Sequence, residues 1–224
     1  MTRASAEWRI DIGDTPVSAH FEPAAAAEPA GMFVFAHGAG GHRADRGMDA
    51  LAGVFRTVGL DVIGFNFPYR ERGSGRPDSM PLLKETIAAV AERGRSERSP
   101  RRLLLGGRSM GGRAASMLAA DGFSCDGLVL LAYPLHPAGQ PKKLRDAHLA
   151  AIRAPVLCFN GTRDTLCRRD LMEDVVSRLP RTWTMHWLEG ADHSFKVLKS
   201  SGRTDADILD EIGRRTFDWL ASDV

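Results

Sequence analysis

The sequence contains no run of the roughly 18 to 20 apolar residues that a membrane-spanning helix needs. Its first residues, MTRASAEWRIDIGD, also hold no apolar core of the length found in secretory signals. Cysteine is scarce, because only Cys125, Cys158 and Cys167 occur, an odd number without CxxC spacing. That pattern favours neither a disulfide framework nor a zinc site. We therefore expect a cytoplasmic protein that has no membrane partner.

A strong excess of one charge is also missing, since 30 basic residues stand against 28 acidic ones and the net charge is +2. No basic stripe is visible along the chain, which argues against nucleic acid as the main partner. No Ser/Gly-rich linker or break in composition divides the 224 residues, of which 43% are hydrophobic. A chain of this size can bury a sizeable core, so we expect a single domain over residues 1–224.

Short apolar runs alternate regularly with helical patterns along the chain. The apolar runs predict strands at 8–12, 16–21, 32–37, 61–66, 102–106, 127–132, 155–160 and 182–189. Helical periodicity predicts helices at 45–58, 80–94, 110–121, 168–179 and 204–222. Such alternation favours an α/β fold with a mainly parallel, doubly wound sheet of about eight strands. The first two runs predict an N-terminal hairpin over about residues 7–22, which forms an antiparallel edge of the sheet.

The last predicted helix has a clear start and a clear apolar face. Thr204 precedes it and is expected to act as its N-terminal cap. The residues that fall on one face of this helix are Ile208, Ile212, Thr216, Phe217 and Leu220.

Three residues with complementary chemistry follow three different predicted strands. Ser109 lies in the turn GGRSMGG after 102–106, Asp164 follows 155–160, and His193 follows 182–189. Because the carboxyl ends of parallel strands meet at one edge of a sheet, we expect the three side chains to lie together. The order serine, acid, histidine along the chain is the one that α/β hydrolases use.

These residue types suit nucleophilic catalysis. A serine hydroxyl is a weak nucleophile at neutral pH, so it needs a base within hydrogen-bonding distance, and the imidazole of His193 can be that base. Asp164 would fix the tautomer of the ring and stabilise the imidazolium ion as it forms. Gly107 and Gly111 would leave room for the sharp turn between strand and helix that presents the serine.

An acyl-transfer site must also stabilise an oxyanion. The turn after the serine supplies the amide of Met110, at the start of the helix. The glycine-rich turn HGAGG supplies a second amide, which we assign to Ala39 with Gly40 as the neighbouring candidate. His37, which precedes this turn, is expected to orient it by hydrogen bonding or to pack beneath it.

Gly40 and further residues at the same edge of the sheet are candidates for substrate contacts. Tyr69 follows the strand 61–66 and Tyr133 follows the strand 127–132. Arg108 adjoins the serine and has two possible roles, either to anchor a loop through backbone carbonyls or an acidic neighbour, or to bind a substrate anion.

Competing interpretations of these motifs need residues that are absent. A phosphate-binding P-loop requires Gly-Lys followed by Ser or Thr, and a dinucleotide-binding turn requires glycine where Arg108 stands. Metal ligation is not expected, because HExxH and similar spacings do not occur among the histidines. Asp192 is the nearest rival to Asp164 and could instead satisfy the backbone of its turn.

Several of these motifs together resemble a known family. The segments AHGAGG, GGRSMGGRAA, YPLHPAGQPKKLRDAHL, GTRD and GADHSF are similar to the small α/β-hydrolase-like family that includes bacterial dienelactone-hydrolase-like proteins and a domain of NSL-complex subunit 3. The similarity begins near residue 30 and continues to the C-terminus. It implies an α/β-hydrolase fold with Ser109 as nucleophile, Asp164 as acid and His193 as base. Dienelactone hydrolase itself uses cysteine as the nucleophile, so the resemblance does not extend to its substrate.

These observations together predict a serine hydrolase without a cap domain, because the stretch between the strands 127–132 and 155–160 is too short to hold one. Its substrate is expected to be a small-molecule carboxylic ester or thioester, and no cofactor or metal is expected. The alternative is a non-catalytic α/β-hydrolase-like module that binds other proteins. The sequence leaves the natural substrate and the oligomeric state open.

Overall fold

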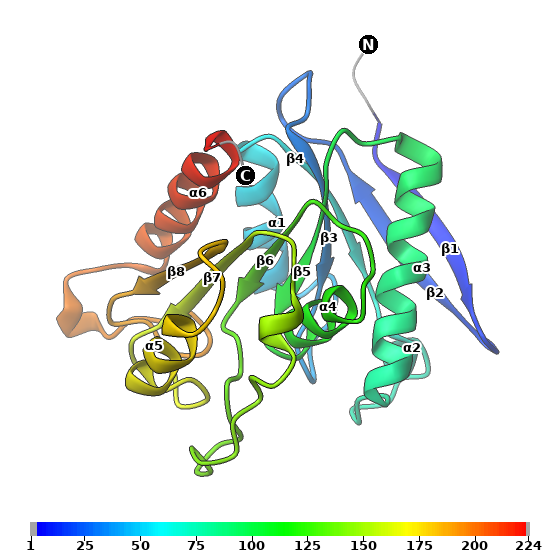
Figure 1. Ribbon diagram of the computed structural model, residues 1–224. Helices are drawn as coiled ribbons and strands as arrows, with labels where there is room; N and C mark the ends of the chain where they lie inside the picture. Colours follow the sequence, from blue (N-terminus) through cyan, green and yellow to red (C-terminus); the bar gives the residue numbers. More distant parts are fainter. Residues whose placement is uncertain (1–3, 223–224) are drawn as a thin grey trace.

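The eight predicted strands join one sheet in the computed structural model, which describes residues 4–222 (Figure 1). They are β1 (Ala6–Ile12), β2 (Thr15–Glu22), β3 (Gly31–Ala36), β4 (Leu60–Phe65), β5 (Leu103–Arg108), β6 (Gly127–Leu131), β7 (Val156–Gly161) and β8 (Trp183–Leu188). Their order across the sheet is β1-β2-β4-β3-β5-β6-β7-β8. The pairs β1·β2 and β2·β4 are antiparallel and the other pairs are parallel, which confirms the predicted mixed sheet.

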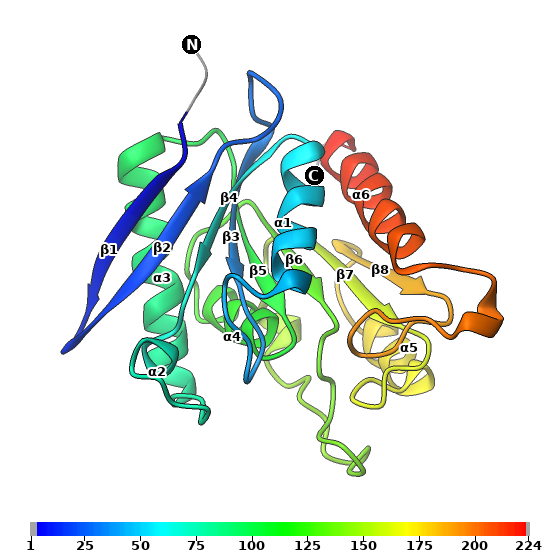
Figure 2. The ribbon, with the colours of Figure 1, turned by 180° about the vertical axis from the view of Figure 1, so that it is seen from behind.

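Helices cover both faces of this sheet (Figures 1 and 2). One face carries α1 (Arg46–Thr57) and α6 (Asp205–Ala221), and the other carries α3 (Met80–Arg98), α4 (Met110–Ala120) and α5 (Arg169–Ser177). A short helix, α2 (Pro68–Glu71), follows β4. Two 3-10 turns complete the set, η1 (Leu149–Ala151) and η2 (Lys199–Ser201).

The central strands are apolar on both sides because each side faces a separate core. In β3 all six residues are buried. Val34 belongs to the core under α3, α4 and α5, whereas Phe33 and Phe35 pack against Phe55 of α1 in the other core. Successive side chains of a strand point to opposite faces, so a near-continuous apolar run is needed where both faces are covered.

Two helix boundaries show how local contacts set the ends. Thr204 caps α6 as predicted, since its hydroxyl accepts a hydrogen bond from the amide of Asp207, whose carboxylate in turn accepts one from the amide of Thr204. Helix α3 continues through Arg98 rather than ending at residue 94, and an Arg93–Glu97 ion pair supports this added turn.

One expectation for α6 is wrong. The apolar periodicity of the sequence places Phe217 on the same face as Ile208 and Ile212, but its side chain is 58% exposed. The buried positions of this turn are taken by Thr216 and Trp219, because the contact face of the helix runs through residues 208, 212, 216 and 219.

The expected lack of a cap domain is confirmed. Between β6 and β7, residues 132–155 form a loop that contains only the single turn η1. Within residues 4–222, no helix is long and apolar enough to cross a membrane.

Candidate active site

Three strand ends bring Ser109, Asp164 and His193 together, as the strand order predicts. The Nε2 atom of His193 lies 2.9 Å from the Ser109 hydroxyl oxygen, and its Nδ1 atom lies 2.8 Å from Asp164 Oδ2. With the ring proton on Nδ1, His193 donates to Asp164 and accepts the hydrogen bond of the Ser109 hydroxyl. The imidazole therefore bridges the other two side chains.

Ser109 occupies a sharp turn between β5 and α4. Its backbone angles are φ 51° and ψ −114°, outside the regions that residues with a side chain normally adopt. The two flanking glycines are required by close approach of β3. A Cβ on Gly107 would lie 2.3 Å from the Ala36 carbonyl oxygen, and one on Gly111 would lie 2.5 Å from the His37 carbonyl oxygen. The predicted steric reason for both glycines is confirmed.

Asp164 is held in place by several donors. Its side chain is buried, Oδ1 accepts a hydrogen bond from the amide of Leu166 at 2.8 Å, and Oδ2 accepts one from the side-chain amide of Asn160 at 3.2 Å. Asn160 also pairs with both the N–H and the C=O of Tyr133, each at 3.1 Å. The amide thus ties the carboxylate to the end of β6.

Asn160 was not recognised in the sequence. It ends the apolar run PVLCFN, where a polar residue resembles an ordinary strand terminus. The one available signal was that a fully buried strand seldom ends in an amide unless that amide has partners.

Asp192, the other acid considered for the triplet, uses its carboxylate to accept hydrogen bonds from the backbone of its own turn. Its Oδ1 accepts hydrogen bonds from the amides of Ser194 and Lys196, at 2.7 and 3.0 Å. These bonds shape the loop that carries His193.

Arg108 anchors the same loop, because its Nη2 donates to the His193 carbonyl oxygen at 3.1 Å. Burial lowers the pKa of its guanidinium, and the carboxylates of Asp192, Asp164 and Asp45 oppose this effect. This contact matches the first of the two roles considered for Arg108.

The glycine-rich turn lies against Ser109, since a Cβ on Gly38 would be 3.5 Å from the Ser109 Cβ. His37 orients this turn as predicted. Its Nδ1 lies 2.8 Å from the Gly38 carbonyl oxygen, and its Nε2 accepts a hydrogen bond from the amide of Phe67 at 3.3 Å. Burial lowers the pKa of His37 to about 4, so the ring is neutral near pH 7 and Nε2 can accept.

The amides assigned to an oxyanion site are available. In the described part of the chain, neither the Ala39 nor the Met110 amide N–H has a hydrogen-bond partner. Ala39 and Gly40 are both exposed beside the turn.

The predicted substrate contacts through Tyr69 and Tyr133 are not supported, because both side chains are fully buried. Tyr69 packs its ring against His37, and the Tyr133 hydroxyl donates to the Arg145 carbonyl oxygen at 2.6 Å. Both residues follow strands at the correct edge, but their side chains point into the core beneath the site.

The remaining histidines have partners in the protein. The contacts are His20 with Glu7, His42 with Asn66, His136 with the amide of Arg168, His148 with Ser116, and His186 with Glu211. Within residues 4–222, no group of three or more His, Cys, Asp or Glu side chains could hold a metal ion.

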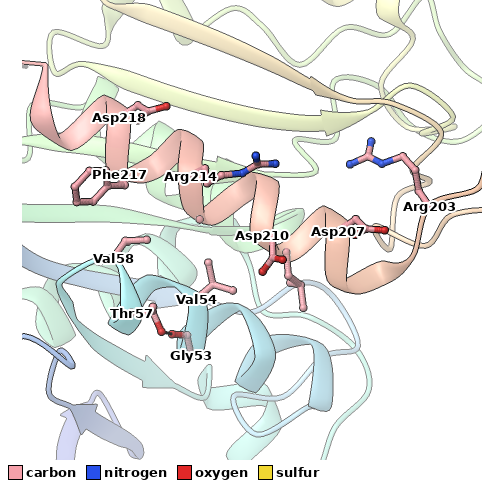
Figure 3. A pocket seen from close by; sticks show the side chains of 12 residues that line it. Gly53, Val54, Thr57, Val58, Arg203, Asp207, Asp210, Arg214, Phe217 and Asp218 are labelled. Atoms are coloured by element: carbon pink, nitrogen blue, oxygen red, sulfur yellow. Dashed lines mark hydrogen bonds between the residues drawn. The ribbon is translucent and has the colours of Figure 1, made fainter.

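A large groove lies away from these residues, between α1 and α6 (Figure 3). Its volume is about 1040 Å³, and Val54, Val58 and Phe217 form its apolar part beside the charged Asp210 and Arg214. It opens on the helix layer opposite α4, so the groove is separate from the Ser109 site.

The pattern of strands, turn and polar triplet agrees with a family comparison. A family model described as an alpha/beta hydrolase domain matches residues 29–221. The chain belongs to the alpha/beta hydrolase family.

Solved structures with the same fold include other members of this family. An alpha-beta serine hydrolase homologue from Coxiella burnetii has a TM-score of 0.76 and 18% identity, over 99% of this α/β hydrolase and 100% of that chain. A serine hydrolase without a lid from Xanthomonas campestris has a TM-score of 0.77 and 21% identity, over 100% of this chain and 99% of that chain. A dienelactone hydrolase from Anabaena variabilis has a TM-score of 0.76 and 18% identity, over 97% of this chain and 96% of that chain. The resemblance to dienelactone-hydrolase-like proteins is confirmed at the level of the fold.

Proposed function

We propose that this α/β hydrolase is a serine hydrolase that cleaves carboxylic esters or thioesters of small molecules. The observation that carries the proposal is the bridging position of His193, 2.9 Å from the Ser109 hydroxyl and 2.8 Å from the Asp164 carboxylate. Hydrogen-bonding distances of this kind are what proton transfer from a serine nucleophile requires.

The reaction would proceed in two halves. His193 takes the hydroxyl proton as Ser109 attacks the carbonyl carbon, and it returns that proton to the leaving alcohol or thiol. The product of this half is an ester of Ser109 with the acyl group. A water molecule that gives a proton to His193 then attacks this ester, and Ser109 recovers its hydroxyl proton as the carboxylic acid leaves. Asp164 holds the ring through its hydrogen bond to Nδ1 in both halves.

The oxyanion of each half-reaction would be held by the amides of Ala39 and Met110, with Gly40 as the neighbouring donor. Each such donor contributes about 100- to 1000-fold to turnover in related chemistry. The first two amides have no hydrogen-bond partner within residues 4–222, which supports this assignment.

Fluorophosphonate labelling tests the proposal, because the probe reacts with an activated serine. We expect stoichiometric labelling of the wild type and none of Ser109→Ala. Ser194→Ala is the matched control, since Ser194 adjoins His193 but is exposed and its hydroxyl makes no hydrogen bond within residues 4–222, and it should label like the wild type.

A second experiment measures hydrolysis of a panel of aryl esters and thioesters of increasing acyl length. If the wild type is not labelled and cleaves none of them, the fold serves a non-catalytic role and the proposal is wrong. Labelling that persists in Ser109→Ala would place the nucleophile at another residue.

A further inference from the structure

A small cavity lies behind the loop that carries His193, between the first turns of α1 and α6. These two helices diverge toward the edge of the sheet that carries Ser109 (Figure 2). The cavity has a volume of about 160 Å³, and its walls come from α1, from α6, from residues 194–196 of the loop and from Arg108. Neither Ser109 nor His193 lines it, so the cavity is separate from the catalytic triplet.

The guanidinium of Arg108 borders this cavity with most of its donors free. Nη2 donates to the His193 carbonyl oxygen, and Nη1 lies 3.9 Å from the position that a Cβ on Gly47, another lining residue, would take. Nη1 and Nε make no hydrogen bond with any residue in 4–222, yet neither is among the buried side-chain atoms that lack a partner. Both nitrogens are therefore accessible, and their three N–H groups can bind a ligand in the cavity.

No carboxylate in residues 4–222 forms an ion pair with Arg108. The carboxylates of Asp192, Asp164 and Asp45 act on its charge only from a distance. Each of these acids already accepts hydrogen bonds from other groups: Asp192 from the amides of its own turn, Asp164 from the amide of Leu166, and Asp45 from the amide of His42. The guanidinium is therefore left without a direct anionic partner.

The other charged residues of the lining add to this positive charge. Lys196 pairs at 2.5 Å with Asp205, which is the one acid among the lining residues. Arg46 is exposed and forms no ion pair in the described part of the chain. A negatively charged ligand in the cavity would thus meet two cations, Arg46 and Arg108, that have no acidic partner.

The rest of the wall is mostly apolar, and its residues are Ala50, Leu51, Phe195, Ile208 and Leu209. An inorganic anion would leave this surface uncovered, whereas an alkyl chain would cover it and gain free energy from the burial. At about 30 Å³ for each non-hydrogen atom, the cavity holds about five such atoms. Propionate has this size, with a charged end and an apolar end.

We propose that this cavity binds a short-chain carboxylate, with the carboxylate group on Arg108 and the alkyl chain against the apolar wall. A carboxylate can accept two N–H groups of one guanidinium at once, and such charge-assisted bonds are about twice as strong as neutral ones. Binding would use the donors that the contact with the His193 carbonyl oxygen leaves free. The inference goes beyond the proposed function, because the site does not include Ser109.

Direct binding is the first test. Propionate is titrated into the wild type and followed by proton NMR, with two comparison ligands, propionamide as the neutral analogue and sulfate as an anion without an alkyl chain. We expect both to bind at least about tenfold more weakly than propionate. Acetate, which lacks one CH₂ group, should bind about fourfold more weakly. Sulfate or propionamide that binds as tightly as propionate overturns the proposal.

Two variants on different walls locate the site. Arg108→Met removes the guanidinium, and Ala50→Phe fills the cavity from α1 without touching the contact between Arg108 and His193. Each should weaken propionate binding by about tenfold or more, and Arg108→Lys, which keeps the charge, should lose less. The controls Arg214→Met and Ala206→Phe change exposed residues of α6 outside the lining and should bind like the wild type. Binding that survives both Arg108→Met and Ala50→Phe overturns the proposal.

A variant counts only if its thermal unfolding is cooperative. Ala50→Phe replaces an exposed residue, so it provides the test if Arg108→Met does not fold.

Fluorophosphonate labelling separates this site from carboxylate binding at Ser109. Propionate in the cavity leaves the serine free, so a saturating concentration should not block labelling of the wild type. Protection from labelling that persists in Ala50→Phe would place the ligand at Ser109 and overturn the proposal. A wild type that is never labelled, but binds propionate through Arg108, would contradict the hydrolase assignment and support the cavity site.

Discussion

Replacing Asn160 with leucine tests whether this residue supports Asp164 through its hydrogen bonds or only by filling space in the core. The substitution keeps a similar volume and removes four hydrogen bonds, two with the backbone of Tyr133, one to Asp164 and one from the Cys158 thiol. The buried N–H of Tyr133 then lacks a partner, at about 1–3 kcal/mol, whereas its C=O keeps the hydrogen bond from the amide of Leu135 at 3.0 Å. The Asp164 carboxylate loses one hydrogen bond, at about 1.5–3 kcal/mol for a charged group. Burial of the leucine side chain offsets about 1.5–3 kcal/mol of this loss. The expected net decrease in the free energy of unfolding is about 1–3 kcal/mol.

The activity of the same variant should fall because the Asp164 carboxylate loses a donor that fixes its orientation. We expect the rate of fluorophosphonate labelling to decrease by about tenfold or more, since small displacements of catalytic groups have large effects. Urea unfolding and a labelling time course measure the two effects. The control is Leu157→Ala in the same strand, whose side chain belongs to the other core, under α1 and α6.

Leu157→Ala should destabilise by about 2–5 kcal/mol through the cavity that it leaves, yet label at nearly the wild-type rate. The reasoning is refuted if Asn160→Leu unfolds at the wild-type urea concentration. It is equally refuted if the two variants label at the same rate, because the effect would then follow from stability alone.

Three further changes probe the structure around the site. Gly111→Ala should lower the free energy of unfolding by about 3 kcal/mol or more, because the added Cβ would meet two carbonyl oxygens. Gly53→Ala, where the added Cβ would enter open space on α1, should raise it by about 0.5–1 kcal/mol. Equal effects of the two changes in urea unfolding would contradict this reasoning. Folding lowers the pKa of His37 from 6.5 to about 4, so between these values the unfolded chain binds a proton that the folded protein does not, and the free energy of unfolding decreases as the pH is lowered. Between pH 7 and 5 the wild type should lose about 2 kcal/mol more of this free energy than His37→Gln. Equal losses in the two proteins would refute this prediction. Thr216→Val removes a buried hydroxyl that has no hydrogen-bond partner in the described residues 4–222, and it should raise the midpoint of thermal unfolding; a clear decrease would show that the hydroxyl is satisfied.

The polar triplet was predictable because its geometry follows from strand order. Ser109, Asp164 and His193 each follow a parallel strand, and such strands place their carboxyl ends at one edge regardless of the detailed packing. Gly107 and Gly111 were predictable for a similar reason, since the turn that exposes the serine forces close approach to β3.

Side-chain direction was not predictable from the same rule. Tyr69 and Tyr133 also follow strands at this edge, but the local backbone turns their rings into the core. Asn160 escaped notice because its partner groups are the backbone of Tyr133, which follows β6, a strand adjacent to β7 in space and distant from it in sequence. The exposure of Phe217 depended on which residues of α6 meet α1 and the sheet, and amphipathic periodicity fixes that face only to within about one residue.

The backbone of Ser109 places activity and stability in opposition. Its positive φ of 51° is an arrangement that glycine adopts without penalty and that other residues adopt at about 1–3 kcal/mol. Ser109→Gly should therefore relieve strain and yield a more stable protein with no nucleophile. Directed evolution for thermostability alone would favour loss of the hydroxyl, so any such selection on this protein must include turnover in its screen.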